Sequence, residues 1–181
     1  MNRLQQTSCS LGCLSWVFDI DGVRWLTLTG TPEAGYRQAA TRFSALGGKV
    51  DLQVQEVWEE ALLAAVECPT VVRQPIPLHL SGTGFQRAVW DALCTIPVGQ
   101  WRTYGDIAAL IGRPRAVRAV GSACGANPLP FLIPCHRVVA SGGRWGGFGL
   151  GLDVKEVLLF REGMIPGTSG QISAHGRIPF L

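Results

Sequence analysis

The sequence predicts an α+β protein in which a small domain of strands and helices precedes a mostly helical domain. Of its 181 residues, 47% are hydrophobic, and the mean hydropathy is +0.22, so the chain can bury a core and is not disordered. Apolar residues alternate with polar ones near the N-terminus and recur at helical spacing after Ser81. We therefore expect domains over residues 1–80 and 81–165 and a loosely ordered tail over 166–181.

The first domain is expected to begin with a β-hairpin. Leu14–Ile20 alternates between apolar and polar side chains, and Val23–Leu28 is a second strand-like run. Between them, Asp21 and Gly22 suit the tight turn that matches the twist of antiparallel strands.

Two helices are expected to follow the hairpin. The first begins at Pro32 and closes at Gly47-Gly48, and the second covers Gln55–Val66 before Pro69. The apolar face of the first helix is expected to comprise Tyr36, Ala39, Ala40 and Phe43. The proline-rich segment Val71–Leu80 is typical of an edge strand or a linker, which places the domain boundary there.

Three helices are expected in the second domain. The first spans Phe85–Ile96, with Thr83 as its N-cap and Pro97 as its stop. Thr103-x-x-Asp106 resembles a capping box, and it begins a second helix that Gly112 ends. The apolar residues of these two helices are Phe85, Ala88, Val89, Ala92, Leu93, Ile96, Ile107, Leu110 and Ile111.

The third helix is expected to begin near Pro114 and to end near Cys124, since proline is tolerated in a first helical turn. Its buried positions are expected to be Val117, Val120, Gly121 and Cys124. Two short helices joined by a turn containing glycine form the outline of a helix-turn-helix, so we expect a winged-helix-like arrangement.

Positive charge is concentrated in the second domain. The net charge is +3, but residues 1–80 carry six basic and eight acidic residues, whereas residues 81–181 carry ten and five. The basic residues between 100 and 150 are Arg102, Arg113, Arg115, Arg118, Arg137 and Arg144, against the single acid Asp106. Such a distribution can attract a polyanion. On charge alone, an ordinary solvated surface is the better explanation.

The third helix can present charge to phosphate. Arg115, Arg118 and Ser122 lie at i, i+3 and i+7, so they project from one face. The face carries little that reads base edges, which normally requires Arg, Lys, Asn or Gln aimed into the major groove. A contact made by this face would therefore tolerate many sequences.

The six cysteines are expected to be reduced. No segment resembles a secretory signal or a membrane span, which predicts a cytoplasmic protein whose thiols are not paired in disulfides. Cys9 and Cys13 have the spacing of half a metal site, but no matching second pair follows, so we expect no structural zinc.

Cys135 is the candidate nucleophile. It lies beside Pro134 and His136 within an apolar stretch. A buried cysteine is usually an inert small hydrophobe, and adjacent side chains point apart, so His136 reaches the sulfur only across a sharp turn or through water. The Cys-His pair alone does not establish a catalytic site.

Four sequence blocks resemble one family in order and spacing. These are YGDIA from Tyr104, RAVG from Arg118 with NP at Asn127, IPCHRVV from Ile133, and LL-x-x-EG from Leu158. From Phe85 to Gly163 the chain resembles the O6-alkylguanine-DNA alkyltransferases, also called methylated-DNA–protein-cysteine methyltransferases. The N-terminal pattern fits the variable first domain of that family, which has a ribonuclease-H-like fold.

The resemblance implies direct-reversal DNA repair by irreversible transfer of the alkyl group from O6-alkylguanine to Cys135. His136 would deprotonate Cys135 through water, and Glu162 would orient His136. Asn127 would fix the active-site turn, and Tyr104 would donate its hydroxyl to the guanine ring. No cofactor or metal is implied, and each molecule would act once because a thioether cannot return to a thiol.

The resemblance also implies a double-stranded DNA partner that is bound in the minor groove, with Arg118 filling the gap left by the extruded base. Arg115, Ser122 and Arg137 would fall in the DNA-facing segment. The carbonyls of Cys135 and Val138 would accept hydrogen bonds from the guanine amine, and the Gly149 N–H would face O6. We expect a monomer in solution, and cooperative assembly on DNA stays open.

One loop departs from the family pattern. Phe148 stands where relatives usually have tyrosine, and Leu150 stands where they have glycine. We expect Leu150 to narrow the pocket lip against large O6 substituents such as benzyl.

Three alternative functions stay open at this point. The family also includes alkyltransferase-like proteins that bind alkylated DNA without the cysteine, and the presence of Cys135 argues against that function. A helix-turn-helix regulator is disfavoured because no sensor or dimerisation region is evident. Cysteine, histidine and glutamate would also suit a cysteine hydrolase.

Overall fold

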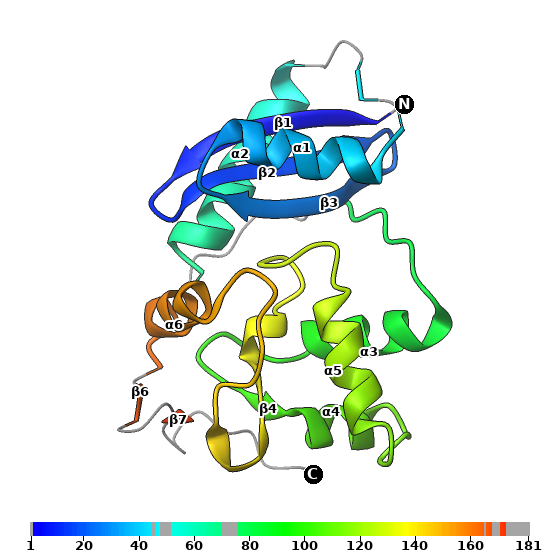
Figure 1. The fold of residues 1–181 in the computed structure, drawn as a ribbon, viewed down its shortest axis with the longest axis vertical. Coiled ribbons are helices and arrows are strands. Elements are labelled where there is room, and N and C mark those ends of the chain that lie inside the picture. The colour runs from blue at the N-terminus through cyan, green and yellow to red at the C-terminus, as the bar shows by residue number, and fades with distance from the viewer. Residues whose placement is uncertain are drawn as a thin grey trace. The chain divides into compact units, whose positions relative to one another are not determined.

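The computed structural model of the protein describes residues 2–44, 46–47, 52–69, 76–164, 166–167 and 171–172. Strands and helices are mixed, as the α+β prediction requires (Figure 1). The chain divides into two compact units, Met1–Ser81 and Gly82–Leu181, which we describe separately. Among the residues that the structure describes, no helix is both long enough and apolar enough to cross a membrane.

The first unit contains a three-stranded antiparallel sheet in the order β1-β2-β3. The strands are β1 (Arg3–Cys9), β2 (Gly12–Asp19) and β3 (Gly22–Thr29). The predicted hairpin of β2 and β3 is confirmed, with Asp19 paired to Gly22 across the turn. Gly22 has φ 140, where an added Cβ would lie 2.3 Å from the Pro77 carbonyl oxygen. The edge strand β1 was not predicted, because its polar sequence shows no alternation of apolar residues.

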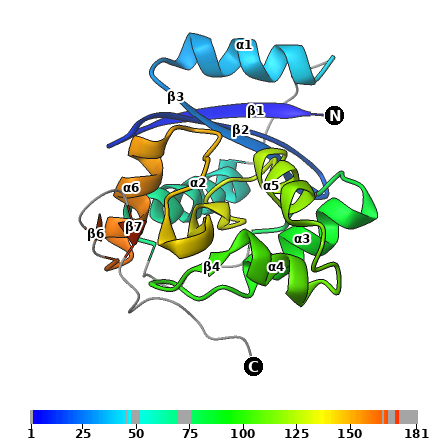
Figure 2. The same ribbon diagram turned by 60° about the horizontal axis from the view of Figure 1, so that its bottom comes forward.

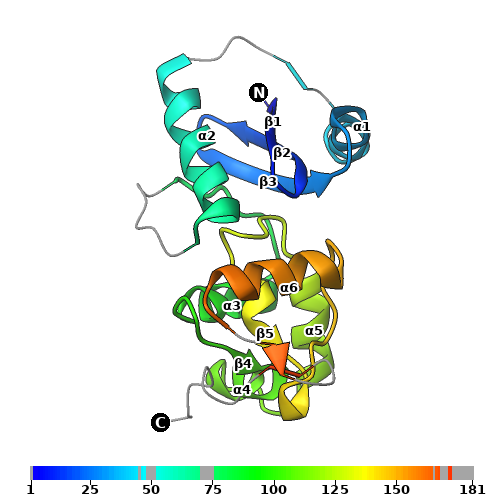
Figure 3. The same cartoon turned by 90° about the vertical axis from the view of Figure 1, so that its left-hand side faces the viewer.

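Helices α1 (Pro32–Arg42) and α2 (Leu52–Glu67) cover opposite faces of this sheet (Figure 3). Neighbouring residues of β2 face opposite sides: Val17 packs with Ala39 of α1, whereas the Phe18 ring meets Trp58 of α2 edge-on at 5.5 Å.

The predicted apolar face of α1 is partly wrong. Tyr36 and Ala40 are exposed, and the helix instead approaches the sheet through Ala39 and Gly35. A Cβ at Gly35 would lie 2.1 Å from the Ser15 hydroxyl, so the absence of a side chain permits this contact.

The proline-rich segment is described only from residue 76 onward, and residues 70–75 lie outside the described part. Leu78 forms an isolated parallel bridge with Val23 of β3. The Val23 N–H donates to Pro77 O at 2.8 Å, and the His79 N–H donates to Val23 O at 2.9 Å. This part of the segment therefore runs beside β3, as expected of an edge strand.

The second unit groups α3 (Gly84–Cys94), α4 (Tyr104–Leu110) and α5 (Val117–Gly125) (Figure 2). Thr83 and Thr103 cap α3 and α4, which confirms the predicted N-cap and the predicted Thr103 capping box, and Thr83 also forms a full capping box with Gln86. The Trp90 indole N–H of α3 donates to Ala123 O of α5 at 2.9 Å, which fixes the two helices together. Gly112 ends α4 with φ 69, as expected.

Several details of these helices differ from the prediction. Helix α5 begins at Val117 rather than Pro114, because residues 113–116 form turns and Ala116 supplies the N-cap. The buried residues of α5 are Val120 and Ala123, while Val117 is 41% exposed. Two further positions predicted to be apolar contacts, Ala88 and Leu110, are exposed.

A parallel pair of short strands organises the rest of this unit. Strand β4 (Arg102–Thr103) pairs with β5 (Val138–Val139). Strand β4 leads directly into Tyr104, and β5 directly follows the 3-10 helix η1 (Cys135–Arg137), so this pairing brings Tyr104 towards Cys135.

The chain then continues through the short η2 (Ser141–Gly143) to helix α6 (Leu152–Arg161). In the segment predicted to be a loose tail, β6 (Pro166–Gly167) and β7 (Gln171–Ile172) form an antiparallel ladder, which corrects the prediction for these residues. The other tail residues lie outside the described part.

Candidate active site

Cys135 occupies the first position of η1, directly after Pro134. Its side chain is buried, with 7% of the residue exposed. Burial raises the pKa of the Cys135 thiol, but several neighbours act in the opposite direction. These are the Asn127 amide, the Lys155 charge and the backbone N–H groups of Cys135 and His136. The site thus holds a neutral thiol while offering hydrogen-bond donors to the thiolate.

Asn127 connects this thiol to the preceding loop. Its Nδ2 lies 3.1 Å from the Cys135 Sγ and also donates to Ile133 O at 2.9 Å. Its Oδ1 accepts from the Leu129 N–H at 3.0 Å. One side chain therefore fixes both ends of the turn and the position of the sulfur.

His136 forms a buried pair with Glu162. The distance from His136 Nε2 to Glu162 Oε1 is 2.9 Å, and both side chains are almost completely buried. Because the carboxylate accepts this hydrogen bond, Nε2 carries the proton and Nδ1 has a free lone pair in the neutral ring. Within the described residues, His136 Nδ1 is buried and has no hydrogen-bond partner.

The charge state of His136 is set by opposing effects. Burial lowers the pKa of His136, the neighbouring Glu162 raises it, and the charges of Arg137 and Lys155 lower it. The pKa of Glu162 is itself lowered: burial raises it, but hydrogen bonds and charges from His136 and Arg137 outweigh that effect. The pair is therefore a carboxylate with a neutral imidazole, which can accept a proton at Nδ1.

Arg137 does not point to a DNA-facing surface, which corrects its predicted role. Its Nη2 lies 2.8 Å from Glu162 Oε1, its Nε lies 2.9 Å from Oε2, and its Nη1 donates to Ile96 O at 2.6 Å. Only 11% of the side chain is exposed. The positive charge that the sequence suggested for DNA is thus used inside the unit.

Lys155 is a buried residue that sequence reasoning missed. Its Nζ donates to Val138 O at 2.7 Å and to Trp145 O, and the residue has no exposed surface. Burial lowers its pKa to about 8. Val138 is also buried, and its carbonyl, which was predicted to accept from a guanine amine, already accepts from Lys155. A lone lysine in a helix gives no sequence signal of this role.

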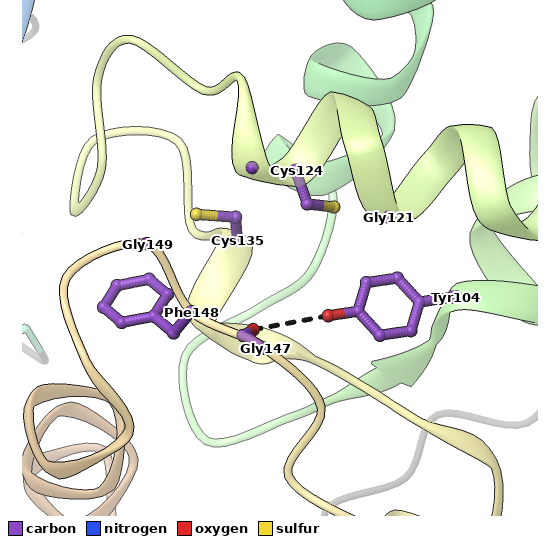
Figure 4. A pocket seen from close by; sticks show the side chains of 8 residues that line it. Tyr104, Gly121, Cys124, Cys135, Gly147, Phe148 and Gly149 are labelled. Carbon is purple, nitrogen blue, oxygen red and sulfur yellow. Dashed lines mark hydrogen bonds between the residues drawn. The ribbon is translucent and has the colours of Figure 1, made fainter.

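Cys135 lines a cavity of about 160 Å³ (Figure 4). Its lining consists of Tyr104, Gly121, Cys124, Gly125, Cys135, Gly147, Phe148 and Gly149. Predicted pocket residues Phe148 and Gly149 are among them, whereas Leu150 and Val138 are not. Leu150 follows the lining residue Gly149 directly, and its expected effect on large O6 substituents stays a prediction.

Cys124 also faces this cavity, which corrects its assignment to the buried face of α5. Figure 4 shows its side chain entering the pocket between Cys135 and Tyr104. Burial raises the pKa of the Cys124 thiol to about 12, and nearby Cys135 adds to the effect. Cys124 therefore remains a neutral thiol in the pocket wall.

Tyr104 and Phe148 place two rings at the pocket. The Tyr104 hydroxyl donates to Gly147 O at 3.4 Å, and burial raises the pKa of Tyr104 to about 12. It therefore keeps its proton and can act as a hydrogen-bond donor. The Phe148 ring lies edge-on to the His136 imidazole, with 6.4 Å between the centroids.

Arg115, Arg118 and Ser122 lie on the surface, outside the network of Cys135. All three are exposed, and the Ser122 hydroxyl donates back to Arg118 O at 3.2 Å. Within the part of the chain that the structure describes, neither guanidinium is in an ion pair. Their charge is therefore available to an external anion.

A possible metal-binding cluster lies elsewhere, in the first unit. Asp19, Asp21 and His79 place three potential ligand atoms within 4.8 Å of one another. The Asp19 carboxylate already accepts from His79 Nδ1 at 2.9 Å and lies 3.3 Å from Arg24 Nη1. These contacts satisfy the carboxylate without a metal, so we assign none.

Comparison with known proteins places this site in a family. Residues 84–164 match the model of the 6-O-methylguanine DNA methyltransferase DNA-binding domain. A methylated-DNA–protein-cysteine methyltransferase of Methanosarcina barkeri is 58% identical over 87 residues, which span 48% of this chain and 55% of that protein. The corresponding Methanosarcina acetivorans protein is 39% identical over 139 residues, or 72% of this chain and 89% of that protein.

Solved structures agree with the sequence comparison over most of the chain. The crystal structure of Mycobacterium tuberculosis OGT in complex with DNA has a TM-score of 0.74 and 31% identity, and the match covers 88% of this chain and 92% of that one. The site agrees with these similarities, since Cys135 lines the pocket and the neighbouring His136 is hydrogen-bonded to Glu162. The chain belongs to the methylated-DNA–protein-cysteine methyltransferase family.

Proposed function

We propose that this protein repairs DNA by transferring the alkyl group of O6-alkylguanine irreversibly to Cys135. The observation that carries the proposal is the position of the Cys135 thiol. It lies at a pocket, beside a histidine whose unpaired Nδ1 is its only free basic atom and whose Nε2 is held by Glu162. A nucleophile and a base oriented by a third group are the requirements of nucleophilic catalysis.

In the proposed reaction, His136 Nδ1 takes the Cys135 proton through a bridging water. The thiolate sulfur then attacks the alkyl carbon, a C–S bond forms and the C–O6 bond breaks. The electron pair of the broken bond leaves with guanine. The proton that His136 took then passes to guanine, so guanine is restored as a neutral molecule. The Tyr104 hydroxyl donates to the guanine ring and offsets the charge that develops on it.

Asn127 and two backbone N–H groups stabilise the thiolate before attack, which counteracts the cost of forming an anion in a buried site. After transfer, the sulfur is part of a thioether and has no proton to lose. Each molecule therefore acts once, and the proposed reaction needs no cofactor.

Helix α5 supplies the proposed contact with double-stranded DNA. Arg115, in the turn before α5, would pair with a phosphate, and Ser122 is exposed on α5 itself. Arg118 would enter the minor groove and fill the gap left by the extruded nucleotide. Because a repair protein acts in any sequence, phosphate contacts and a wedge suffice, and α4 with α5 would serve as the helix-turn-helix.

The extruded base would occupy the cavity beside Phe148, with its O6 facing the Gly149 N–H. The Cys135 carbonyl would accept from the guanine amine. The Val138 carbonyl can also accept from it while it holds Lys155, because a carbonyl oxygen has two lone pairs. These main-chain contacts would identify guanine with little demand on side chains.

The same proposal includes a monomer that acts in the cytoplasm. The reaction needs one free thiol and one DNA duplex, and neither step requires a second subunit. A reducing compartment keeps Cys135 available as a thiol.

The test is the intact mass of the protein after incubation with duplex DNA that contains O6-methylguanine. Transfer adds about 14 Da, the mass of one methylene, and Cys135→Ala abolishes the gain. Cys124→Ala is the matched control, because it removes the other thiol of the pocket and is expected to keep the adduct. Binding of the methylated DNA without an adduct would support the non-catalytic binder instead and overturn the proposal.

A further inference from the structure

The Glu162 carboxylate is shared among three kinds of donor. Oε1 accepts from His136 Nε2 at 2.9 Å and from Arg137 Nη2 at 2.8 Å. Oε2 accepts from Arg137 Nε at 2.9 Å and from the Gly99 N–H at 3.3 Å. The imidazole and the guanidinium thus bind the same anion, and Oε1 contacts both of them.

The contact of Glu162 with both His136 and Arg137 bears on how His136 can act as a base in the proposed reaction. A buried carboxylate in contact with a histidine favours the imidazolium, because the two opposite charges stabilise each other in a site that excludes water. An imidazolium has no lone pair at Nδ1 and cannot take a proton from Cys135. The group that orients His136 would therefore also disable it, unless another cation balances the carboxylate.

We propose that Arg137 is a positioning residue that balances the Glu162 charge and so keeps His136 neutral as the base for Cys135. The inference rests on the proposed function and adds a residue to it. Arg137 touches neither the pocket nor the thiol, and it acts through Glu162 and His136. The Glu162 charge is then paired with a permanent cation, and the imidazole can remain uncharged.

The geometry of Arg137 fits this role. Both Nε and Nη2 bind the carboxylate, which is the two-point arrangement that a guanidinium forms and an ammonium cannot. On its other side, Nη1 donates to Ile96 O at 2.6 Å, so the end of α3 holds the guanidinium in place. Arginine also stays charged at every physiological pH, so its effect on His136 is constant.

The other charged and titratable groups nearby either lower the pKa of His136 as well or lie further from it. Lys155 lowers the pKa of His136 in addition to Arg137, and Cys135 is the thiol that His136 serves. On α3, Asp91 and Cys94 interact with each other, and Cys94 also senses the charge of Arg137. Glu162 is the anion that faces His136, and Arg137 is the cation that binds it directly.

The test compares Arg137→Gln with wild type in single-turnover transfer, with protein in saturating excess over methylated DNA, across the pH range in which both fold. The expected result is an upward shift of the acid limb by about one pH unit, or about a tenfold loss of rate on that limb. Arg137→Lys, which keeps the charge, is expected to return the acid limb most of the way to its wild-type position. The matched surface control Arg144→Gln is expected to keep the wild-type midpoint.

A direct measurement separates this inference from the proposed function. The 15N chemical shifts of the His136 ring report its protonation without DNA and without transfer, and Arg137→Gln is expected to raise the pKa of His136. If both variants lose rate equally at all pH values and His136 titrates as in wild type, Arg137 is only structural and the inference is overturned. If wild type transfers nothing, the proposed function fails while the titration still tests the charge balance.

A double variant covers the case in which Arg137→Gln does not fold. Arg137→Gln with Glu162→Gln removes both charges of the pair, so neither charge is left without its partner. His136 in this variant is expected to titrate no higher than in wild type. A His136 pKa raised above the wild-type value in the double variant would contradict the proposed balance, because no carboxylate remains to favour the imidazolium.

Discussion

The arginines of the second unit fall into two environments that the sequence does not distinguish. Arg118 on α5 and Arg115 in the turn before it are exposed and form no ion pair in the described part of the chain. Arg137 lies in the same basic stretch of sequence, yet its guanidinium is buried against Glu162. The surface pair can bind an external anion, whereas Arg137 already has an internal one.

The difference teaches that local charge density does not by itself define a binding surface. A charge on the surface costs little and interacts weakly with its neighbours in water, but a buried charge depends on its partner for several kcal/mol. Substitutions in the two environments should therefore separate cleanly into effects on folding and effects on DNA binding.

The largest effect is expected from Glu162→Ala. The substitution leaves the buried Arg137 guanidinium without its anion, and removing one partner of a buried pair typically costs about 3–5 kcal/mol. The free energy of unfolding, measured by urea denaturation, should fall by that amount. Arg115→Ala is the control and should change it by no more than about 0.5 kcal/mol. A loss of similar size in both variants would erase the distinction between the two environments.

The next effect concerns the thiol beside this ion pair. Alkylation of Cys135 adds atoms to a buried position and removes its capacity to ionise, so the spent protein should be less stable by about 1–3 kcal/mol, as in other overpacked sites. Thermal unfolding of the protein before and after reaction with methylated DNA measures the change. Equal melting temperatures would show that the pocket relaxes freely around the alkyl group.

Lowering the pH should reduce the stability of the protein through the buried Glu162 pair rather than through the exposed arginines. The pKa of Glu162 is lower in the folded protein than in the unfolded chain, so its contribution to stability is present above about pH 4.3 and is lost as the pH falls through the folded value. Each unit of difference corresponds to about 1.4 kcal/mol. Wild type should therefore lose stability more steeply than Glu162→Gln below pH 4.3. Parallel curves would contradict the charged pair.

The smallest effect on folding and the clearest effect on DNA binding are expected at Arg115. Each lost phosphate contact reduces the slope of log binding constant against log salt concentration by about one unit. Arg115→Ala should show this change in a fluorescence anisotropy titration of duplex DNA at several salt concentrations. Arg144→Ala provides the surface comparison outside α5. An unchanged slope for Arg115→Ala would remove Arg115 and the turn before α5 from the proposed DNA interface.

Sequence reasoning located the elements better than their surroundings. The Asp21-Gly22 turn, the Thr83 N-cap and the Thr103 capping box depend on neighbouring residues alone, and the structure confirms all three. Strand β1 was missed because it is held by pairing with β2, and its mostly polar residues show no strand pattern of their own. Helix α5 begins after Pro114 because the turn over residues 113–116 takes up that segment instead.

The motifs named the site residues, but they predicted only part of the contacts among them. Cys135, His136, Glu162, Asn127 and Tyr104 were all identified by motif, and in the structure Asn127 is hydrogen-bonded to the Cys135 thiol and His136 to Glu162. The motif could not reveal that Arg137 turns inward, because charge in a sequence does not report burial. Cys124 and Lys155 were missed for the same reason, since their roles depend on how the chain folds around them.

Four of the eight residues that line the cavity are glycines, namely Gly121, Gly125, Gly147 and Gly149. None of them has a positive φ, and a Cβ added at any of them would meet no atom within 4 Å. Each could therefore acquire a methyl group that projects into free space without straining the backbone. The range of alkyl groups that the pocket admits can consequently drift in steps of one carbon, at four separate positions, while the thiol and its base stay unchanged.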